Sequence, residues 1–309
     1  MAVIIDAKPL FLQIREEVKR EVEQLRRQGI SPGLAVILAE DDPTSKLYVS
    51  KKIKDCGKVG IYSEIWELYD IPIEKRMNAL INLISELNER HDITGILVQL
   101  PLPPQIDMYR VLGRILPEKD VDGLTPQNKG LLMSSYDLDR DPLPCTAIGI
   151  MKLLDHWGIN VSGMFVVIVG RSELVGKPLF KLLLDRDATP VCVHRRSKET
   201  EKLLKKADMV ICAAGRPPEL FKEDPFRLTG DMIEEGTIVI NVGIRRDGAG
   251  NVYYDVDFES VVEKCSYITK NETVGYMTRA MLLKNTIKTS KMFAERIHHL
   301  TLYNYNAID

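Results

Sequence analysis

The sequence has few cysteines, and their spacing suits neither a crosslink nor a metal site. The five cysteines are odd in number and widely scattered, and no two of them form a Cys-x-x-Cys pair. This spacing argues against a disulfide framework and against a zinc site. The five histidines form no cluster with cysteines or carboxylates either. We therefore predict no bound metal.

A long apolar run and an excess charge of one sign are also missing. No segment has the length of a membrane span, and the N-terminus lacks the basic and apolar regions of a signal peptide. The 42 lysines and arginines nearly balance the 44 acidic residues, which leaves a formal net charge of -2. Such a chain has no broad field for nucleic acid or anionic lipid. We expect a cytoplasmic protein that binds a small molecule, with no nucleic acid and no membrane as partner.

The chain has the length and composition of a two-domain globular protein. It contains 309 residues, of which 45% are hydrophobic and 28% charged. Short β-branched runs alternate with amphipathic stretches, a pattern typical of parallel sheets covered by helices, so we predict an α/β fold throughout. The predicted strands are 34–39, 63–68, 95–100, 165–169, 191–193, 209–213 and 237–242, and the predicted helices are 9–28, 43–57, 73–90, 146–157 and 277–299.

The periodic pattern stops between residues 116 and 144. Proline, glycine, aspartate and asparagine accumulate in this stretch, which is typical of an ordered connecting loop. We place a domain boundary within it.

A strand-to-helix turn in the second half has the residues of a phosphate site. The buried run 165–169 is followed by Gly170, Arg171 and Ser172, and then by Val175 and Gly176. Glycine permits a tight turn and a close approach of phosphate, and the amides at the start of the next helix favour an anion. Two glycines six residues apart also fit a purely structural contact between helix and strand, so that alternative stays open.

The next predicted strand indicates which dinucleotide binds. NAD-binding units carry a carboxylate about 20 residues after the glycine turn, where it accepts the ribose hydroxyl. Here the strand ends in His194, Arg195, Arg196 and Ser197. Guanidiniums and a hydroxyl suit a 2′-phosphate, so the sequence predicts NADP, with Arg171 as a third cationic contact. A solvated basic turn is the alternative interpretation.

The first half carries a lysine that is suited to proton transfer. A helix is expected after the Asp-Pro pair at 42–43, and it places Tyr48 and Lys52 four residues apart on one face. A partly desolvated lysine can accept and donate protons. Lys51 fits the spacing nearly as well, and a solvated helix face is the alternative. Gln99 at the end of an apolar strand and Asp122 in a later loop are candidate binding groups, although a turn also explains Asp122.

Several short motifs occur in order along the chain and together resemble one enzyme family. The motifs are Asp41-Asp42-Pro43-Thr44-Ser45 with Tyr48 and Lys52, Gln99-Leu100-Pro101-Leu102-Pro103, Lys119-Asp120-Val121-Asp122-Gly123, Pro126-Gln127-Asn128-Lys129-Gly130, Pro144-Cys145-Thr146, Gly170-Arg171-Ser172 with Val175-Gly176-Lys177-Pro178, Ala207-Asp208, Gly215-Arg216-Pro217 and Asp255-Val256-Asp257-Phe258. The match extends over about residues 1–295, and the sequence is similar to the bifunctional methylenetetrahydrofolate dehydrogenase/methenyltetrahydrofolate cyclohydrolase family.

The resemblance implies an activity and assigns roles to the candidate residues. It implies NADP-dependent oxidation of 5,10-methylenetetrahydrofolate to the methenyl form, and hydrolysis of that form to 10-formyltetrahydrofolate. Lys52 would be the catalytic lysine, Tyr48 would stack on or orient the folate, Gln99 would tune the lysine, and Asp122 would bind the pterin. The further cofactor contacts that it implies are Ala214, Gly215, Val242, Gly243, Ile244 and Thr278.

The resemblance also implies the domain organisation. Residues 1–144 with 277–309 would form a folate-binding catalytic domain, and residues 145–276 would form a Rossmann-like NADP-binding domain. The C-terminal helix would pack back on the first domain, the two domains would enclose a cleft, and the nucleotide domains would pair in a homodimer.

Two positions depart from the family pattern. Asn241 stands where the family has aspartate, and the segment 270–278 is one residue shorter than usual and lacks proline and glycine positions. These changes affect turn geometry. A monofunctional dehydrogenase or cyclohydrolase is therefore an alternative, as is a folate-binding or nucleotide-binding protein without turnover.

Overall fold

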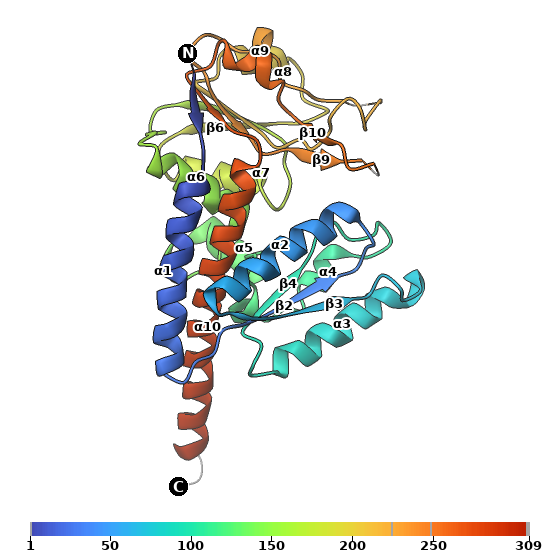
Figure 1. Ribbon diagram of the computed structural model, residues 1–309, viewed down its shortest axis with the longest axis vertical. Helices are drawn as coiled ribbons and strands as arrows, with labels where there is room; N and C mark the ends of the chain where they lie inside the picture. The colour runs from blue at the N-terminus through green and yellow to red at the C-terminus, as the bar shows by residue number, and fades with distance from the viewer. Residues whose placement is uncertain (1, 224, 248, 307–309) are drawn as a thin grey trace. The chain divides into compact units, whose positions relative to one another are not determined.

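The chain forms two compact α/β units, which we name by their sheets. The computed structural model describes residues 2–223, 225–247 and 249–306, with the backbone alone from 297 onward (Figure 1). The six-stranded unit consists of the residues up to Phe11 and of Thr146–Thr278, and the three-stranded unit of Leu12–Cys145 and the residues from Arg279 onward. The predicted α/β class is confirmed.

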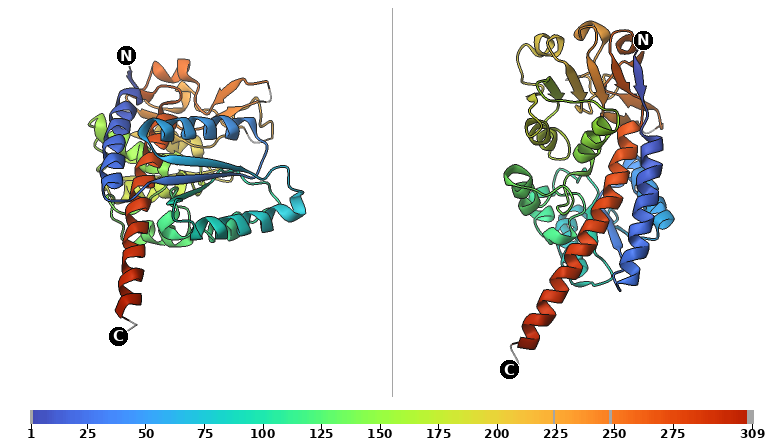
Figure 2. Two further views of the ribbon diagram at one scale, coloured as in Figure 1. Left: turned by 60° about the horizontal axis from the view of Figure 1, so that its bottom comes forward. Right: turned by 90° about the vertical axis from the view of Figure 1, so that its left-hand side faces the viewer.

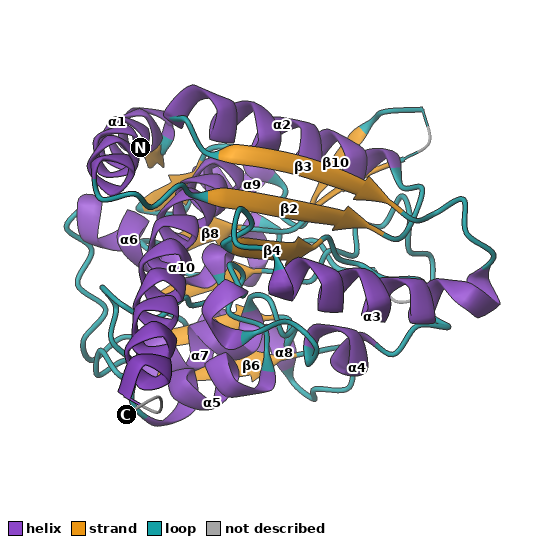
Figure 3. Ribbon diagram, turned by 90° about the horizontal axis from the view of Figure 1, so that it is seen from below, coloured by secondary structure: helices purple, strands orange, loops and turns teal. Residues whose placement is uncertain are grey.

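The sheet of the three-stranded unit is parallel, with the order β3-β2-β4. Its strands are β2 (Gly33–Leu38), β3 (Tyr62–Glu67) and β4 (Gly95–Val98). α2 (Pro43–Val59) leads from β2 to β3, and α3 (Ile73–Glu89) leads back across β2 to β4. Because both crossovers are right-handed and run in opposite directions, the two helices cover opposite faces of the sheet (Figure 3). All six residues of β2 are buried between them.

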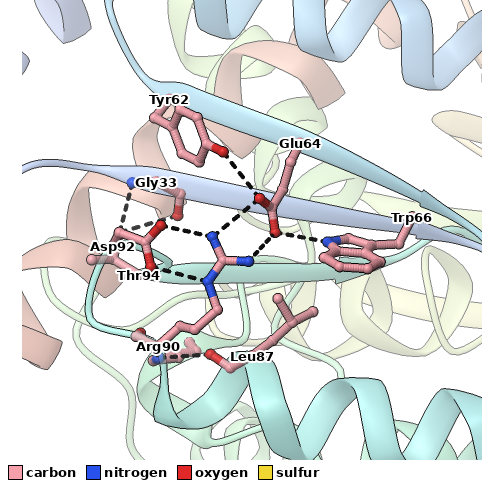
Figure 4. A network of polar contacts seen from close by, with 9 residues as sticks. Gly33, Tyr62, Glu64, Trp66, Leu87, Arg90, Asp92 and Thr94 are labelled. Atoms are coloured by element: carbon pink, nitrogen blue, oxygen red, sulfur yellow. Dashed lines mark hydrogen bonds and ion pairs between the residues drawn. The ribbon is translucent and has the colours of Figure 1, made fainter.

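A salt-bridge network fixes the end of α3 against the edge strand β3 (Figure 4). Arg90, directly after the helix, donates to both carboxylate oxygens of Glu64 at 2.7 and 3.1 Å, and it also pairs with Asp92 at 2.7 Å. Tyr62 and Trp66, on the same strand, donate to Glu64 at 3.0 and 2.7 Å. The Glu64 carboxylate thus accepts hydrogen bonds from three side chains, on a strand that is otherwise half-exposed.

Two long helices from opposite ends of the sequence lie side by side in space (Figure 2). α1 (Lys8–Arg27) buries an apolar stripe that includes Ile14, Val18 and Val22. α10 (Thr273–Asn306) is longer than the predicted 277–299, and residues 307–309 of the predicted domain lie outside the described residues. Within the three-stranded unit the two helices are joined by Lys284, which donates to Glu21 at 2.7 Å.

The stretch 116–144 is not a simple connecting loop, and that prediction was wrong. It contains a short 3-10 helix η1 (Pro117–Lys119) and the helix α5 (Pro126–Ser134), and the short helix α4 (Met108–Leu112) precedes it. Thr125 caps α5, because its Oγ1 accepts from the Asn128 amide at 3.3 Å, and proline suits the first helical position. Along the chain, the boundary between the two units falls between Cys145 and Thr146, which is after this stretch rather than within it.

The larger sheet is also parallel, with the order β1-β11-β8-β7-β5-β6. Within this sheet the chain passes from β5 to β6 on one side and then returns to add β7 on the other side of β5. Such a reversal opens a crevice at the carboxyl ends of the strands, where ligands bind in α/β folds. The bounds are β1 (Val3–Ile5), α6 (Cys145–His156), β5 (Phe165–Val169), α7 (Gly176–Leu184), β6 (Thr189–Val193), α8 (Thr200–Lys205), β7 (Met209–Cys212), η2 (Gly230–Met232), β8 (Ile238–Asn241), the hairpin β9 (Ile244–Arg246) and β10 (Val252–Tyr254), α9 (Phe258–Val262) and β11 (Tyr267–Thr269).

The N-terminal strand differs from our expectation. We predicted residues 1–144 in one domain, but β1 pairs in parallel with β11, with Val3 opposite Tyr267. Thr273 reinforces this pairing, because its Oγ1 donates to the Ile5 carbonyl at 3.1 Å. The residues up to Phe11 therefore lie with the six-stranded sheet. Three-residue strands such as β1 and β11 have too short a pattern to be recognised from the sequence.

Candidate active site

Lys52 is buried on α2 and is held by Gln99. Only 7% of Lys52 is exposed, and its Nζ donates to Gln99 Oε1 at 2.9 Å. Gln99 follows β4 and is fixed in turn, because its own amide group donates to the Leu100 carbonyl at 2.8 Å. Lys51 is half-buried instead. The structure thus distinguishes two lysines that spacing alone did not separate.

α2 begins where the sequence predicted and presents Tyr48 one turn before Lys52. Asp42 caps the helix, since its Oδ2 accepts from the Ser45 amide at 2.7 Å, and Pro43 occupies the first position. Tyr48 is half-buried. The spacing of four residues places its phenol on the same face as Lys52.

Asp122 lies in a loop that is fixed from several sides. Lys119 is fully buried, and its Nζ donates to the carbonyls of Leu87, Asn88 and Arg90 at 2.7–2.9 Å, at the end of α3. On the other side of Asp122, Gly123 has φ +63°, and a Cβ there would lie 2.6 Å from a backbone carbonyl. A side chain carried by such a loop has little freedom to move.

The following helices reinforce the same loop. Asp120 is buried and accepts from the Thr125 amide at 2.7 Å and from Asn128 at 2.9 Å. On α10, Asn285 Nδ2 donates to the carbonyls of Val121 and Leu143, each at 2.8 Å. The main chain that carries the half-buried Asp122 carboxylate is therefore held in place.

The pKa of the Cys145 thiol is affected by both Lys52 and Asp122. Burial raises the pKa of its thiol well above the usual value, the Asp122 carboxylate raises this pKa further, and the Lys52 ammonium lowers it. Both charged groups are therefore close to the same sulfur. The sequence marked Cys145 only as part of the motif Pro144-Cys145-Thr146, without a role, and it gave no signal for Asn285. A buried thiol and a buried amide in a helix resemble ordinary core residues.

The predicted phosphate turn connects β5 to α7 and requires both of its glycines. Gly170 has φ +123°, and a Cβ there would lie 2.4 Å from the Ala213 carbonyl oxygen. A Cβ at Gly176 would lie 2.2 Å from the Gly170 carbonyl oxygen. Ser172 Oγ accepts from the Val175 amide at 3.1 Å, and Arg171 is exposed. Backbone thus packs against backbone with no room for side chains, as a close phosphate approach demands.

The turn after β6 borders a cavity of about 260 Å³. His194 donates its amide to Ser197 Oγ at 3.0 Å, and the Arg196 amide donates to His194 Nδ1 at 3.2 Å. His194, Arg195 and Ser197 line the cavity, whereas Arg196 is not among its lining residues. Arg216, from the segment after β7, also lines the cavity, although we had not predicted it as a contact.

The loops after β7 and β8 meet at a buried carboxylate. Asp255 is 0% exposed and accepts from the amides of Gly215 and Arg216 at 2.7 and 3.2 Å. A Cβ at Gly243 would lie 1.8 Å from Asp255 Oδ2, so only glycine fits there. Burial raises the pKa of Asp255, although the two amides favour the carboxylate.

The remaining predicted cofactor residues lie near the same strand ends. Ala214 follows β7, and Ile244 begins β9. The amides of Val242 and Gly243 both donate to the Cys212 carbonyl, at 2.8 and 2.9 Å. The carboxyl ends of β8, β7, β5 and β6 therefore carry most of the predicted contacts along one edge of the sheet.

Thr278 and the shortened segment belong to the start of α10. The segment turns at Glu272, which has φ +66°, and the helix begins at the next residue. Thr278 Oγ1 donates to the Val274 carbonyl at 2.9 Å and lies 3.1 Å from Thr146 Oγ1. The segment that is shorter than the family pattern therefore leads directly into a helix.

Two features are absent from the described residues. Among them, no group of three or more histidine, cysteine, aspartate or glutamate side chains is arranged to hold a metal ion. No helix in the described parts of the chain combines the length and the apolar character needed to cross a membrane.

Two family descriptions match consecutive parts of the chain. Residues 5–122 match the catalytic domain of tetrahydrofolate dehydrogenase/cyclohydrolase. Residues 144–294 match the NAD(P)-binding domain of the same family. Together the two matches extend over most of the sequence.

Individual relatives resemble the chain over nearly its full length. The bifunctional protein FolD of Pyrobaculum aerophilum is 47% identical, over 98% of this chain and 99% of that protein. The crystal structure of the bifunctional FolD enzyme of Campylobacter jejuni is 41% identical, with a TM-score of 0.85 over 94% of this chain and 99% of that one. The Trypanosoma brucei methylenetetrahydrofolate dehydrogenase-cyclohydrolase, complexed with NADP and an inhibitor, is 34% identical, with a TM-score of 0.83 over 94% and 98%. The chain belongs to the tetrahydrofolate dehydrogenase/cyclohydrolase family.

Proposed function

We propose that the protein oxidises 5,10-methylenetetrahydrofolate with NADP and hydrolyses the resulting 5,10-methenyltetrahydrofolate to 10-formyltetrahydrofolate. The observation that carries this proposal is the buried Lys52, which is hydrogen-bonded to Gln99. Lys52 and Asp122 both shift the pKa of the Cys145 thiol, so both lie close to it. A lysine held in this way is a proton-transfer group beside polar groups that can bind a ligand. Family membership supplies the substrate class.

The six-stranded unit has the features that NADP requires. Gly170 and Gly176 leave the backbone open to a pyrophosphate, and Arg195 and Ser197 line a cavity suited to a 2′-phosphate. NADP, when bound, supplies the acceptor for the hydride that leaves the one-carbon bridge. The nicotinamide contacts that we propose are Val242, Gly243, Ile244 and Thr278, with Ala214 and Gly215 beside them.

The chain's own residues act on the folate and on the protons. We assign Asp122 to binding the pterin and Tyr48 to orienting it, so that the bridge carbon is held in place. Loss of a hydride leaves that carbon as a methenyl cation, to which a water oxygen bonds. Lys52 takes a proton from this water, which leaves a hydroxyl group on the carbon. The bond between the carbon and N5 then breaks as N5 receives a proton and the hydroxyl loses its own, so that the carbon becomes the formyl carbonyl on N10. Gln99 keeps the Lys52 amine directed at the reacting atoms.

A coupled assay tests both steps. We expect purified protein mixed with methylenetetrahydrofolate and NADP to form NADPH and methenyltetrahydrofolate, followed by 10-formyltetrahydrofolate faster than spontaneous hydrolysis. Formation of NADPH without accelerated hydrolysis would identify a monofunctional dehydrogenase. Binding of both ligands without NADPH would identify a protein that holds folate without turnover.

Two further statements belong to this proposal. We propose a cytoplasmic homodimer formed through the six-stranded units, as the family resemblance implies. Light scattering should give twice the chain mass of 35.0 kDa. A mass equal to a single chain would contradict the dimer.

A further inference from the structure

A buried ion pair lies about one helical turn from Lys52. Lys52 and Asp55 are three residues apart on the buried face of α2, and only 3% of Asp55 is exposed. Asp55 Oδ2 accepts from Nη1 of Arg279, a residue of α10 with 12% of its side chain exposed. Asp55 and Arg279 both belong to the three-stranded unit. A carboxylate that is buried in this way needs a counter-ion, and Arg279 supplies one.

Lys52 and Asp55 occupy positions from which they could pair with each other. Oppositely charged residues three apart on a helix are neighbours and commonly form ion pairs. Both also act on one thiol: the pKa of Cys56 is raised to about 12, mainly by burial and further by the Asp55 carboxylate, whereas the Lys52 ammonium lowers it. In the structure, however, Lys52 donates to the neutral Gln99 at 2.9 Å, and Asp55 is bonded to Arg279.

We propose that Arg279 is a positioning residue for Lys52, because it keeps the Asp55 carboxylate from becoming the partner of the Lys52 amine. An opposite charge beside a lysine favours its protonated form, and a protonated amine cannot take a proton from water. While Arg279 holds Asp55, Lys52 keeps the neutral Gln99 as its partner and can act as a base. This inference deepens the proposed hydrolysis step and rests on it.

The other charged and titratable groups around Lys52 are the same with or without Arg279. Among the described residues they come from α2, from α6 and from the loop before α5, and they are Tyr48, Lys51, Cys56, Cys145, Asp120 and Asp122. Their effects on Lys52 are common to the wild type and to every variant at Arg279. A comparison of these proteins therefore isolates the pairing of Asp55.

Removing Arg279 should release Asp55 toward Lys52. Arg279→Met keeps an unbranched apolar side chain but removes the guanidinium, so the buried carboxylate needs another cation. We would measure methenyltetrahydrofolate hydrolysis against pH, corrected for the spontaneous reaction. The rising limb of this profile should move up by about 1–3 pH units, the usual effect of one close opposite charge. On that limb, each unit lowers the rate at a given pH by about tenfold.

A second change at Asp55 distinguishes this mechanism from a purely structural role. Asp55→Asn keeps the shape of the side chain but removes its charge, so alone it should leave the rising limb within about half a pH unit of the wild type. In the Arg279→Met background it should return the profile to the wild-type position, because no carboxylate is left to pair with Lys52. Arg279→Lys should shift the profile less than Arg279→Met, since it keeps a cation for Asp55.

Two further variants separate electrostatics from loss of structure. Arg279→Gln keeps a hydrogen-bond donor for Asp55 without the charge, and it should move the rising limb upward even where Arg279→Met does not fold. Lys284→Met is the matched control, because it breaks another ion pair of α10, with Glu21 at 2.7 Å. It should leave the pH profile unchanged.

The outcomes decide between the two proposals. A profile that does not move in Arg279→Met or Arg279→Gln, or a shift that Asp55→Asn does not reverse, would overturn the role of Arg279. An equal shift in Lys284→Met would also overturn it, because loosening α10 would then be a sufficient cause. Failure of the wild-type protein to accelerate hydrolysis would instead overturn the proposed function.

Discussion

The two units carry their candidate site residues in different ways, and we call the three-stranded unit the side-chain half and the six-stranded unit the backbone half. In the three-stranded unit, side chains position other side chains: Gln99 holds Lys52, and Asn285 supports the loop that carries Asp122. In the six-stranded unit, backbone packs on backbone, and Gly170 and Gly176 leave no space between the turns. Proton transfer needs a particular functional group, whereas phosphate binding needs amides and a close approach. The difference in construction therefore follows the difference in chemistry.

The largest expected effect is in the side-chain half. Lys52→Met removes the amine but keeps the apolar stem, so it should lower methenyltetrahydrofolate hydrolysis by about 10²–10⁴-fold, the usual worth of a general acid–base group. NADP affinity should stay close to normal. The matched control is Lys51→Met, at the half-buried neighbour. If the control loses hydrolysis instead, or if neither variant does, Lys52 is not the proton-transfer group.

Asn285→Ala should damage the support of the same half. The change leaves the buried carbonyls of Val121 and Leu143 without this donor, which should lower the free energy of unfolding by about 2–4 kcal/mol. It should also raise the KM for folate more than the KM for NADP. Lys291→Met, which breaks an exposed ion pair of the same helix with Glu21, should cost less than about 1 kcal/mol in urea unfolding. Equal costs for the two variants would contradict this account.

The backbone half should be most sensitive at Gly170. An alanine there meets the Ala213 carbonyl in an unfavourable backbone conformation, so Gly170→Ala should raise the Kd for NADP more than about tenfold and destabilise the protein by more than about 1 kcal/mol. Gly57→Ala is the control, because no atom lies within 4 Å of its Cβ position in α2. It should stabilise the protein by about 1 kcal/mol. Normal NADP binding in Gly170→Ala would show that this turn is not the phosphate site.

The backbone half also contains a buried carboxyl group, that of Asp255. Its contribution to the stability of the protein should change with pH. Burial raises the pKa of Asp255 in the folded protein above its ordinary value of 3.8. The folded state therefore binds a proton more readily than the unfolded state, and the stabilisation from this proton is lost as pH rises through the raised pKa. Wild type should thus gain stability relative to Asp255→Asn as pH falls from 7 toward 4. A difference between the two proteins that stays constant with pH would contradict this explanation.

The smallest expected effect concerns the shortened segment. Glu272 adopts φ +66°, a conformation that costs a non-glycine residue about 1–2 kcal/mol. Glu272→Gly relieves this cost but removes the partly exposed ion pair with Arg246, at 3.4 Å. The net change in unfolding free energy should lie between zero and about 1 kcal/mol of stabilisation, measured in urea. A destabilised variant would show that the ion pair outweighs the backbone strain.

The sequence predicted the long elements and the strand ends well, because both have local signals. Apolar periodicity located α1, α2 and α3, and the motif after β5 located the tight glycine turn before α7. The helix α5 was missed although Thr125 and Pro126 are a recognisable start, because proline and glycine around it indicated a loop. The roles of the supporting residues were not predictable, although the family motifs include Cys145 and Asp255. Asn285, Cys145 and Asp255 act through partners that are distant along the chain, and such contacts leave no local pattern.

The pairing of β1 with β11 has a consequence for protein synthesis. The strand β1 finds its partner only after residue 267 has been made, since Val3 lies opposite Tyr267. At about 5–20 residues per second, that strand waits for many seconds while the three-stranded sheet between them can already form. Its exposed residues Val3 and Ile4 are apolar, so an unpaired first strand is a point at which a nascent chain could associate with a neighbour. Completion of the larger sheet therefore depends on a strand that is made long before its partner.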